Sequence, residues 1–214
     1  MAEFKLGEEQ NYGNSSGSAF LSLKDDGDVK NVRFMYRDSN DVKGVCVHEV
    51  QINGKRRYVN CLRDYNSPID DCPLCKNNFK QIVKVYVPLY DVAEQKVCFW
   101  ERGKKYFSTL SGLCARYPNL VSHTFDIERH GAKGSKDTTY NVYETGADAT
   151  TLESLPEIPE VIGGVVMSKT ADEMNTYLQT GDFPYNSQPQ PHHQSSPIPN
   201  VVPQRRTPVN TEVF

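Results

Sequence analysis

The residues best suited to chemistry are one histidine and three cysteines, in the spacing H-x12-C-x10-C-x2-C: His48, Cys61, Cys72 and Cys75. A Cys-Pro-Leu-Cys turn lets two thiolates converge on one ion, and a cysteine and a histidine on strands complete a tetrahedron. The spacing predicts one structural zinc ion, with no open position where water could be activated. Cys46 lies two residues before His48 and would project from the same strand face, so either could be the fourth ligand.

Enzymatic interpretations of these residues fit less well. A thioredoxin-like C-x-x-C follows a buried strand, whereas Cys72 follows the polar loop RDYNSPIDD. A zinc deaminase needs H-x-E and a proline before its first cysteine, whereas His48 and Glu49 are adjacent and Pro73 lies between the two cysteines. A zinc-dependent hydrolase would need a three-ligand, open site. The sequence has no nucleophile elbow, P-loop or dinucleotide fingerprint, so we expect a non-enzymatic protein.

Two segments, IVKVYVPLY and KVCFWERG, alternate between apolar side chains and a mixture of aromatic and cationic ones. Such alternation is typical of strands, so we expect Val97 and Phe99 to point inward and Trp100 to lie on an outward, polar face. The outward residues, with the neighbouring basic residues, form the candidate nucleic-acid-binding set: Lys55, Arg56, Arg57, Tyr58, Lys84, Tyr86, Tyr90, Trp100, Arg102, Lys104 and Lys105.

Cations interleaved with aromatic rings suit a single-stranded nucleic acid, because phosphates need positive charge and unstacked bases need a π face. Stacking contributes about 1 to 3 kcal/mol per base and is largely independent of sequence. The alternative is that the rings are barrel-rim residues and the lysines a solvated face. Tyr140 and Tyr143 would lie on opposite faces of their strand, so we expect at most one on the binding side. Arg33 and Arg37 are weaker candidates.

The charge distribution agrees with a site for a polyanion. Residues 1–29 carry 2 basic and 6 acidic side chains, residues 30–107 carry 15 and 9, and residues 108–214 carry 7 and 12. The local balances of −4, +6 and −5 place a positive middle between acidic flanks, which the whole-chain charge of −3 conceals.

Short alternating runs dominate the expected secondary structure. They occur between about residues 18 and 144, are mostly four to nine residues long, and are bounded by Gly, Asn, Asp or Pro. Asn53-Gly54 predicts a hairpin between two of them, and the stretch 104–117 has helical spacing. We therefore expect a mainly β fold, namely an OB-type barrel with an inserted zinc-binding subdomain and one or two short helices.

Two further elements follow from local signals. The stretch TLESLPEIPEVIGG, beyond Thr145, is broken by Pro and Gly and predicts an ordered loop. Thr170 to Glu173 has the form of a capping box, and Gly181 is a stop signal, so we expect a short helix between them that packs on the barrel. Cys98 and Cys114 lie in apolar surroundings and are expected to be small buried hydrophobes.

The chain divides into three parts by composition. Residues 1–17 predict a flexible arm, residues 18–182 an OB-fold domain for single-stranded DNA with the zinc subdomain at about 44–80, and residues 183–214 a disordered tail with 7 prolines. No run approaches the roughly 18 apolar residues that span a bilayer, and the start has no signal peptide. We expect a soluble, cytoplasmic protein with no membrane partner.

The runs VHEVQINGKRRYVNCLRDYNSPIDDCPLC and KVCFWERGKKYF resemble the single-stranded DNA-binding (helix-destabilising) protein of T-even bacteriophages and its zinc-containing relatives. The similarity covers roughly residues 29–110. It implies an OB fold with an inserted zinc subdomain that binds single-stranded DNA in phage replication, recombination and repair, in the bacterial host cytoplasm. By position it implies His48, rather than Cys46, as the fourth ligand, and Trp100 as the first base-stacking residue.

Two departures from that family limit the resemblance. The first 17 residues hold Glu3, Glu8 and Glu9 against Lys5, whereas the family's arm is basic and supports cooperative self-association. The tail is not strongly acidic, although its end, EVF, faintly resembles the tips through which bacterial single-strand binders recruit replication proteins. The oligomeric state and the choice between DNA and RNA have no signature in this sequence. The alternative function is a zinc-stabilised protein-interaction module that regulates transcription or assembly.

Overall fold

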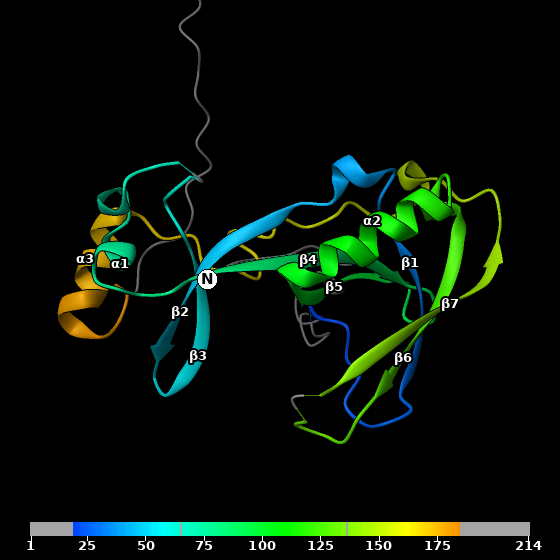
Figure 1. Ribbon diagram of the computed structural model, residues 1–214, viewed down its shortest axis with the longest axis horizontal. Coiled ribbons are helices and arrows are strands. Elements are labelled where there is room, and N and C mark those ends of the chain that lie inside the picture. Colours follow the sequence, from blue (N-terminus) through cyan, green and yellow to red (C-terminus); the bar gives the residue numbers. More distant parts are fainter. Residues whose placement is uncertain (1–18, 65, 136, 185–214) are drawn as a thin grey trace, which may run out of the picture.

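The computed structural model describes residues 19–64, 66–135 and 137–184, so the expected arm and nearly all of the expected tail lie outside the described residues. Seven strands form one antiparallel sheet (Figure 1). They are β1 (Val29–Phe34), β2 (Gly44–Ile52), β3 (Lys55–Asn60), β4 (Gln81–Asp91), β5 (Lys96–Gly103), β6 (His123–His130) and β7 (Thr139–Ala147). The mainly β class is therefore confirmed.

Strand β4 organises the sheet because it pairs with three other strands. Along one edge its residues Lys84 to Asp91 pair with β5, and along the other it pairs first with β2 and then with β1. The hydrogen-bonded order is β3-β2-β4-β1-β6-β7, with β5 on the free edge of β4. No ladder joins β5 to β7 within the described residues, so the sheet does not close into a hydrogen-bonded barrel.

The hairpin between β2 and β3 turns where its sequence predicts. Asn53 and Gly54 both have positive φ values, of 50° and 72°. A two-residue turn with two left-handed positions matches the right-handed twist of the flanking strands. This geometry fixes the register that pairs His48 with Val59, and so it sets the position of one candidate metal ligand.

Three α-helices accompany the sheet: α1 (Pro73–Lys76), α2 (Phe107–Arg116) and α3 (Ala171–Thr180). The predicted helix at 104–117 begins as a short 3-10 turn, η4 (Lys104–Tyr106), and continues as α2. Its Phe107 ring packs on Gly44, where an added Cβ would lie 2.9 Å from the ring. A glycine in β2 is therefore needed for α2 to approach the sheet.

The capping signals of α3 are confirmed, but its expected packing is wrong. The Thr170 hydroxyl accepts from the Glu173 amide, the Glu173 carboxylate accepts from the Thr170 amide, and Gly181 ends the helix with φ 77°. The helix packs beside α1 and against Val50 and Val59 of β2 and β3, away from the strands β6 and β7 (Figure 1). Phe183, expected to begin the tail, is buried and stacks on Tyr177 with ring centroids 4.7 Å apart.

Two main groups of buried side chains result. The first lies between the curled sheet and α2 and includes Phe34, Leu110 and Phe125. The second surrounds the candidate metal ligands and includes Leu74 and Met174, neither of which has exposed surface. We call the β2–β3 hairpin, α1 and α3, which enclose the second group, the metal-side lobe. Strands β2 and β4 run between the two groups, so this lobe and the rest of the sheet share backbone hydrogen bonds.

The segment between β7 and α3 is an ordered loop, as predicted, and it covers a second face of the sheet. The Met167 amide donates to the Tyr58 carbonyl, and the Asn60 amide donates to the Met167 carbonyl. Near the other end of the chain, residues 19–23, where the alternating runs were expected to begin, form no named strand and pair only through an isolated parallel bridge between Phe20 and Phe99. Both segments bury side chains of β4 and β5 that alternation alone would place in solvent.

Candidate metal centre and basic hollow

Four side chains converge at the metal-side lobe: His48 from β2, Cys61 just after β3, and Cys72 and Cys75 at α1. Their ligand atoms all lie within 4.8 Å of one another. The Cys72 and Cys75 sulfurs are each 3.5 Å from His48 Nε2, and the Cys61 and Cys75 sulfurs are 3.7 Å apart. The group is therefore close enough to hold one metal ion.

Of the two candidates for the fourth ligand, the structure brings only His48 into this group. His48 is completely buried and belongs to the group, whereas Cys46 does not. The Cys46 carbonyl instead accepts a hydrogen bond from the Cys61 amide at 2.9 Å. Cys46 thus helps to position Cys61 through its backbone and contributes no ligand atom.

Surrounding polar groups orient the ligands. His48 Nδ1 lies 3.2 Å from the Lys80 carbonyl, which leaves Nε2 facing the sulfurs. Such a contact fixes both the tautomer and the ring orientation of a metal-binding histidine. Gln81 Nε2 donates to the Cys61 sulfur at 3.2 Å. Residues 80 and 81 therefore join the metal group to the start of β4.

The environment of the two C-x-x-C thiols differs. Burial raises the pKa of Cys72, but amide hydrogen bonds from Cys75, Leu62 and Leu74 outweigh it and hold that pKa below its usual value. Burial raises the pKa of Cys75 to about 11. Amides aimed at a sulfur stabilise a thiolate, which is the form that binds metal.

A hollow of about 930 Å³ opens between the start of β4, the end of β5 and the start of β7. Four of its lining residues are cations, namely Lys80, Arg102, Lys104 and Lys105. Two tyrosines, Tyr106 and Tyr140, also line it. The other lining residues are Gln81, Ile82, Val83, Gly103, Thr138 and Thr139. No carboxylate lines it among the described residues. We call this set the basic hollow.

The expected orientation of Trp100 is wrong. Only 2% of Trp100 is exposed, and it belongs to the first buried group together with Val85 and Val87. The register pairs Val87 with Trp100 and Val85 with Arg102, so these residues share one sheet face. Phe99 points to the opposite face, where it packs near Tyr86. Alternation was correct, but the inward and outward assignment of β5 was inverted.

Tyr86 lies on the face of β4 opposite Val85 and Val87, as expected, but that face is covered, so its expected exposure is wrong. It is 4% exposed, and its hydroxyl has no hydrogen-bond partner among the described residues. The adjacent Lys84 ammonium lies 2.6 Å from Glu101 and 4.6 Å from the centre of the Tyr58 ring. Lys84, Tyr58 and Tyr86 thus form a cluster on the sheet face opposite Arg102.

Other candidates for nucleic-acid binding lie apart from the basic hollow. Lys55, Arg56 and Arg57 are exposed on the β2–β3 hairpin, where Arg56 approaches Glu49 at 3.7 Å. Tyr90 lies near the far end of β4, opposite Val97. Seven residues along a strand from Val83 to Tyr90 correspond to about 23 Å. The structure brings only Arg102, Lys104 and Lys105 of the candidate set into the hollow.

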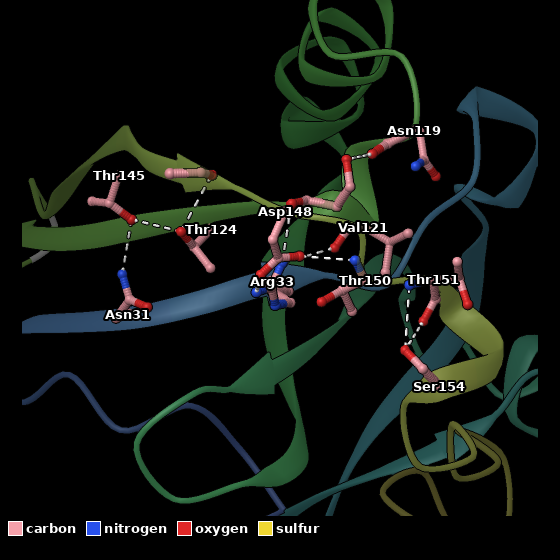
Figure 2. A network of polar contacts seen from close by, with 12 residues as sticks. Asn31, Arg33, Asn119, Val121, Thr124, Thr145, Asp148, Thr150, Thr151 and Ser154 are labelled. Carbon is pink, nitrogen blue, oxygen red and sulfur yellow. Dashed lines mark hydrogen bonds and ion pairs between the residues drawn. The ribbon is translucent and has the colours of Figure 1, made fainter.

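The weaker candidate Arg33 is used inside the protein. Its guanidinium donates to the carbonyls of Val121 and Ser122, at 3.3 and 3.1 Å, and pairs with Asp148 (Figure 2). Hydrogen bonds donated by Thr150 and the pair with Arg33 lower the pKa of Asp148 to about 2. Arg33 therefore joins β1 to the η5 turn (Leu120–Ser122) and to the start of the long loop, and it is not available to a ligand.

Several residues of the hollow were missed from the sequence. Lys80 lies just before β4 and Gln81 begins it, so neither belongs to the alternating part of the strand. Tyr106 was assigned to the predicted helix at 104–117 and was not considered for binding. The run Gly103-Lys104-Lys105-Tyr106 was a usable signal, since a tyrosine directly follows two lysines. Tyr140 lines the hollow whereas Tyr143 is 51% exposed elsewhere, in agreement with their opposite orientations.

The two remaining cysteines behave as expected from their surroundings. Cys98 is 2% exposed within the first buried group, and Cys114 packs partly buried against it. Neither belongs to the metal-binding group found among the described residues.

Comparisons with known proteins give no family for the chain. No protein family model matches it, and the curated proteins include no significant match. None of the helices in residues 19–64, 66–135 and 137–184 is both long and apolar enough to cross a membrane.

Proposed function

We propose that this chain is a non-enzymatic, largely sequence-independent single-stranded DNA-binding protein of the zinc-containing phage type, acting in DNA replication, recombination and repair in the bacterial host cytoplasm. The observation that carries the proposal is the basic hollow. Four cations and two tyrosines line a space of about 930 Å³ with no neighbouring carboxylate among the described lining residues. Positive charge beside aromatic rings is the combination that single-strand binders use.

The arrangement of strands supports an OB-type domain within this proposal. The path β5-β4-β1-β6-β7 curls so that Trp100 of β5 meets Tyr140 of β7, with ring centroids 5.2 Å apart. The hollow lies at this junction, where the described residues form no ladder between β5 and β7. We call the unpaired junction of β5 and β7 the open seam. Such a junction leaves side chains of both strands accessible to an extended single strand of DNA.

Zinc is the metal that we propose for the four-residue group. Tetrahedral zinc, with Zn–S of about 2.3 Å and Zn–N of about 2.0 Å, places two sulfurs about 3.8 Å apart and a sulfur about 3.5 Å from a nitrogen. The separations of 3.7 and 3.5 Å fit this geometry. His48, Cys61, Cys72 and Cys75 would fill all four positions, and the ion would supply folding energy rather than a reactive water.

The test is fluorescence anisotropy of labelled oligo-dT with the zinc-loaded full chain, at low and high salt. We expect binding that weakens as salt rises, because cations that contact phosphates release counterions. The double variant Lys104→Ala/Lys105→Ala should weaken binding and flatten the salt dependence. The matched control, Lys24→Ala/Lys76→Ala, removes two exposed lysines outside the hollow and should change neither.

Two other ligands complete the design. Tighter binding to a duplex than to oligo-dT would overturn the proposal. Oligo-rU of the same length distinguishes a DNA binder from an RNA binder, since the 2′-hydroxyl is the group that differs.

The second candidate function is a zinc-stabilised protein-interaction module. It is favoured by an apolar hollow of about 310 Å³ whose lining includes Met35, Pro88, Phe99, Leu152 and Ile158. If this function were correct, the Lys104→Ala/Lys105→Ala variant would bind oligo-dT as the wild type does. Any binding of oligo-dT by the wild type would then be weak and would not depend on the basic hollow.

A further inference from the structure

Arg102 sits in a corner formed by three aromatic rings at the base of the basic hollow. Its Cζ lies 4.2 Å from the centre of the Trp100 ring and 3.9 Å from that of Tyr140. These two rings are nearly perpendicular, and Tyr106 meets Trp100 edge-on at 5.0 Å. The rings come from β5, η4 and β7, so the open seam of the sheet builds the corner.

The Arg102 cation lacks a carboxylate partner among the described residues. Its neighbour on the opposite face, Lys84, is paired with Glu101 at 2.6 Å. Aromatic faces stabilise a guanidinium electrostatically, and arginine keeps its charge even when it is partly buried. Burial lowers the pKa of Arg102, and contact with Tyr140 opposes this shift. A cation is thus held in place without being neutralised.

Two hydrogen-bond donors in this corner are also unused. Arg102 Nε and Trp100 Nε1 are buried, and neither has a hydrogen-bond partner among the described residues. Both are donors only, so the group that would satisfy them must be an acceptor. Buried polar groups without partners are uncommon and costly, which makes two in one contact cluster informative.

We propose that Arg102 binds a backbone phosphate of the single strand and is the anion anchor of the basic hollow. This inference rests on the proposed DNA-binding function. A phosphate offers acceptors and negative charge together, which is what the corner lacks. The Trp100 and Tyr140 rings then support the guanidinium. In this role Trp100 holds Arg102 in position and is not the base-stacking residue expected from the sequence.

The assignment differs from base recognition by arginine. A guanidinium can also bind the O6 and N7 edge of guanine, which would make binding depend on sequence. A phosphate anchor instead contacts every strand in the same way. The two possibilities therefore predict different behaviour with oligo-dT and with an oligonucleotide that contains guanine.

The experiment compares wild type, Arg102→Gln and Arg102→Lys at a series of salt concentrations. We expect Arg102→Gln to weaken binding of oligo-dT by about tenfold to a hundredfold and to lower the salt slope by about one. Arg102→Lys keeps the charge but not the planar fork, so it should keep the slope and lose less affinity. Lys104→Gln is the matched control for an exposed cation at the same hollow, and should cost less affinity than Arg102→Gln.

A neutral methylphosphonate placed at single positions of oligo-dT tests the contact from the DNA side. Wild type should lose affinity at one position, and Arg102→Lys should be less sensitive there. Because this experiment compares wild type with Arg102→Lys, it tests the phosphate contact even if Arg102→Gln does not fold correctly.

Each contrary outcome has its own meaning. If wild type binds oligo-dT but Arg102→Gln binds with unchanged affinity and slope, the anchor is wrong and the proposed function stands. A loss confined to guanine-containing oligonucleotides would also overturn the phosphate assignment. If wild type fails to bind any single strand, it is the proposed function that fails.

Discussion

His48 is the residue at which the proposed metal site and local packing are most closely combined. Its Nε2 faces two sulfurs, its Nδ1 contacts the Lys80 carbonyl, and none of its surface is exposed. Cys46 has the same strand orientation but lies outside the ligand group. The pair therefore offers a matched comparison between a ligand and a neighbour.

We expect His48→Ala to lose the bound metal and Cys46→Ser to retain it, because only His48 contributes a ligand atom. Metal content per chain, measured by elemental analysis of the purified variants, checks this directly. Thermal unfolding of the same samples should show a lower midpoint for His48→Ala. Metal loss from Cys46→Ser with retention in His48→Ala would contradict the ligand assignment.

Glu94 provides a pH-dependent contribution to stability. Hydrogen bonds and ion pairs with Lys30 and Lys96 lower the pKa of Glu94 to about 2, from an ordinary value of 4.5. A carboxylate with a lowered folded-state pKa stabilises the protein above its unfolded-state pKa. This contribution is therefore complete above about pH 4.5 and is lost as the pH falls towards 2.

We expect Glu94→Gln to reduce the loss of stability between pH 4.5 and 2. Urea unfolding at several pH values in that range measures the difference. The effect should shrink at high salt because the group is exposed. Glu157→Gln, which removes an exposed carboxylate that forms no ion pair among the described residues, is the control and should leave the pH dependence as in wild type.

At the scale of elements, α3 is attached to the metal-side lobe through a few side chains. Met174 is completely buried beside Cys72, and its sulfur lies 4.0 Å from the cysteine sulfur. The Tyr177 hydroxyl donates to the Gln51 carbonyl at 3.3 Å, which joins the helix to β2. The helix thus covers Cys72 and also contacts β2.

Met174→Ala should destabilise the protein by about 2 to 5 kcal/mol, the range for removing a buried methionine side chain. It should also speed the release of the metal, because the cover over Cys72 is weakened. Urea unfolding and the rate of metal transfer to a chromogenic chelator measure the two effects. Asn175→Ala, one residue along on the exposed face of α3, should change neither. Equal effects of both substitutions would argue against this packing role.

At the scale of the whole molecule, the four-residue metal group and the basic hollow have two residues in common. The Lys80 carbonyl contacts His48, the Gln81 amide contacts Cys61, and both residues also line the hollow. The first buried group, between the sheet and α2, has no direct part in the metal site. Loss of the metal should therefore affect one lobe and the hollow more than the rest.

We expect removal of the metal by a chelator to increase hydrogen exchange in α1, α3 and the first residues of β4, while β1 and β6 remain protected. Binding of oligo-dT should weaken in the same samples, because the contacts of Lys80 with His48 and of Gln81 with Cys61 would no longer hold these two residues in position. Hydrogen exchange read by mass spectrometry, followed by anisotropy, tests both effects. Uniform loss of protection along the chain would show that the two lobes unfold together. Re-addition of zinc should restore both readouts.

Local signals in the sequence determined much of the site and of the secondary structure. The C-x-x-C turn and a cysteine and a histidine near paired strands pointed to Cys61, Cys72 and Cys75, but left His48 and Cys46 as alternatives for the fourth position, and the family resemblance favoured His48. The Asn53-Gly54 turn and the capping box of α3 were read correctly. These features depend on contacts between residues close in sequence.

The tertiary structure decided what each strand face meets. Alternation separates the two faces of β5 but does not say which one is covered, and here both are covered. Trp100 faces the first buried group because β4 pairs it with Val87, while residues 19–21 and the loop before α3 help to bury Phe99 and Tyr86 on the other side. The basic hollow likewise exists only because β5 and β7, distant in sequence, meet without pairing. Such burial depends on long-range packing, which the period of a single strand does not contain.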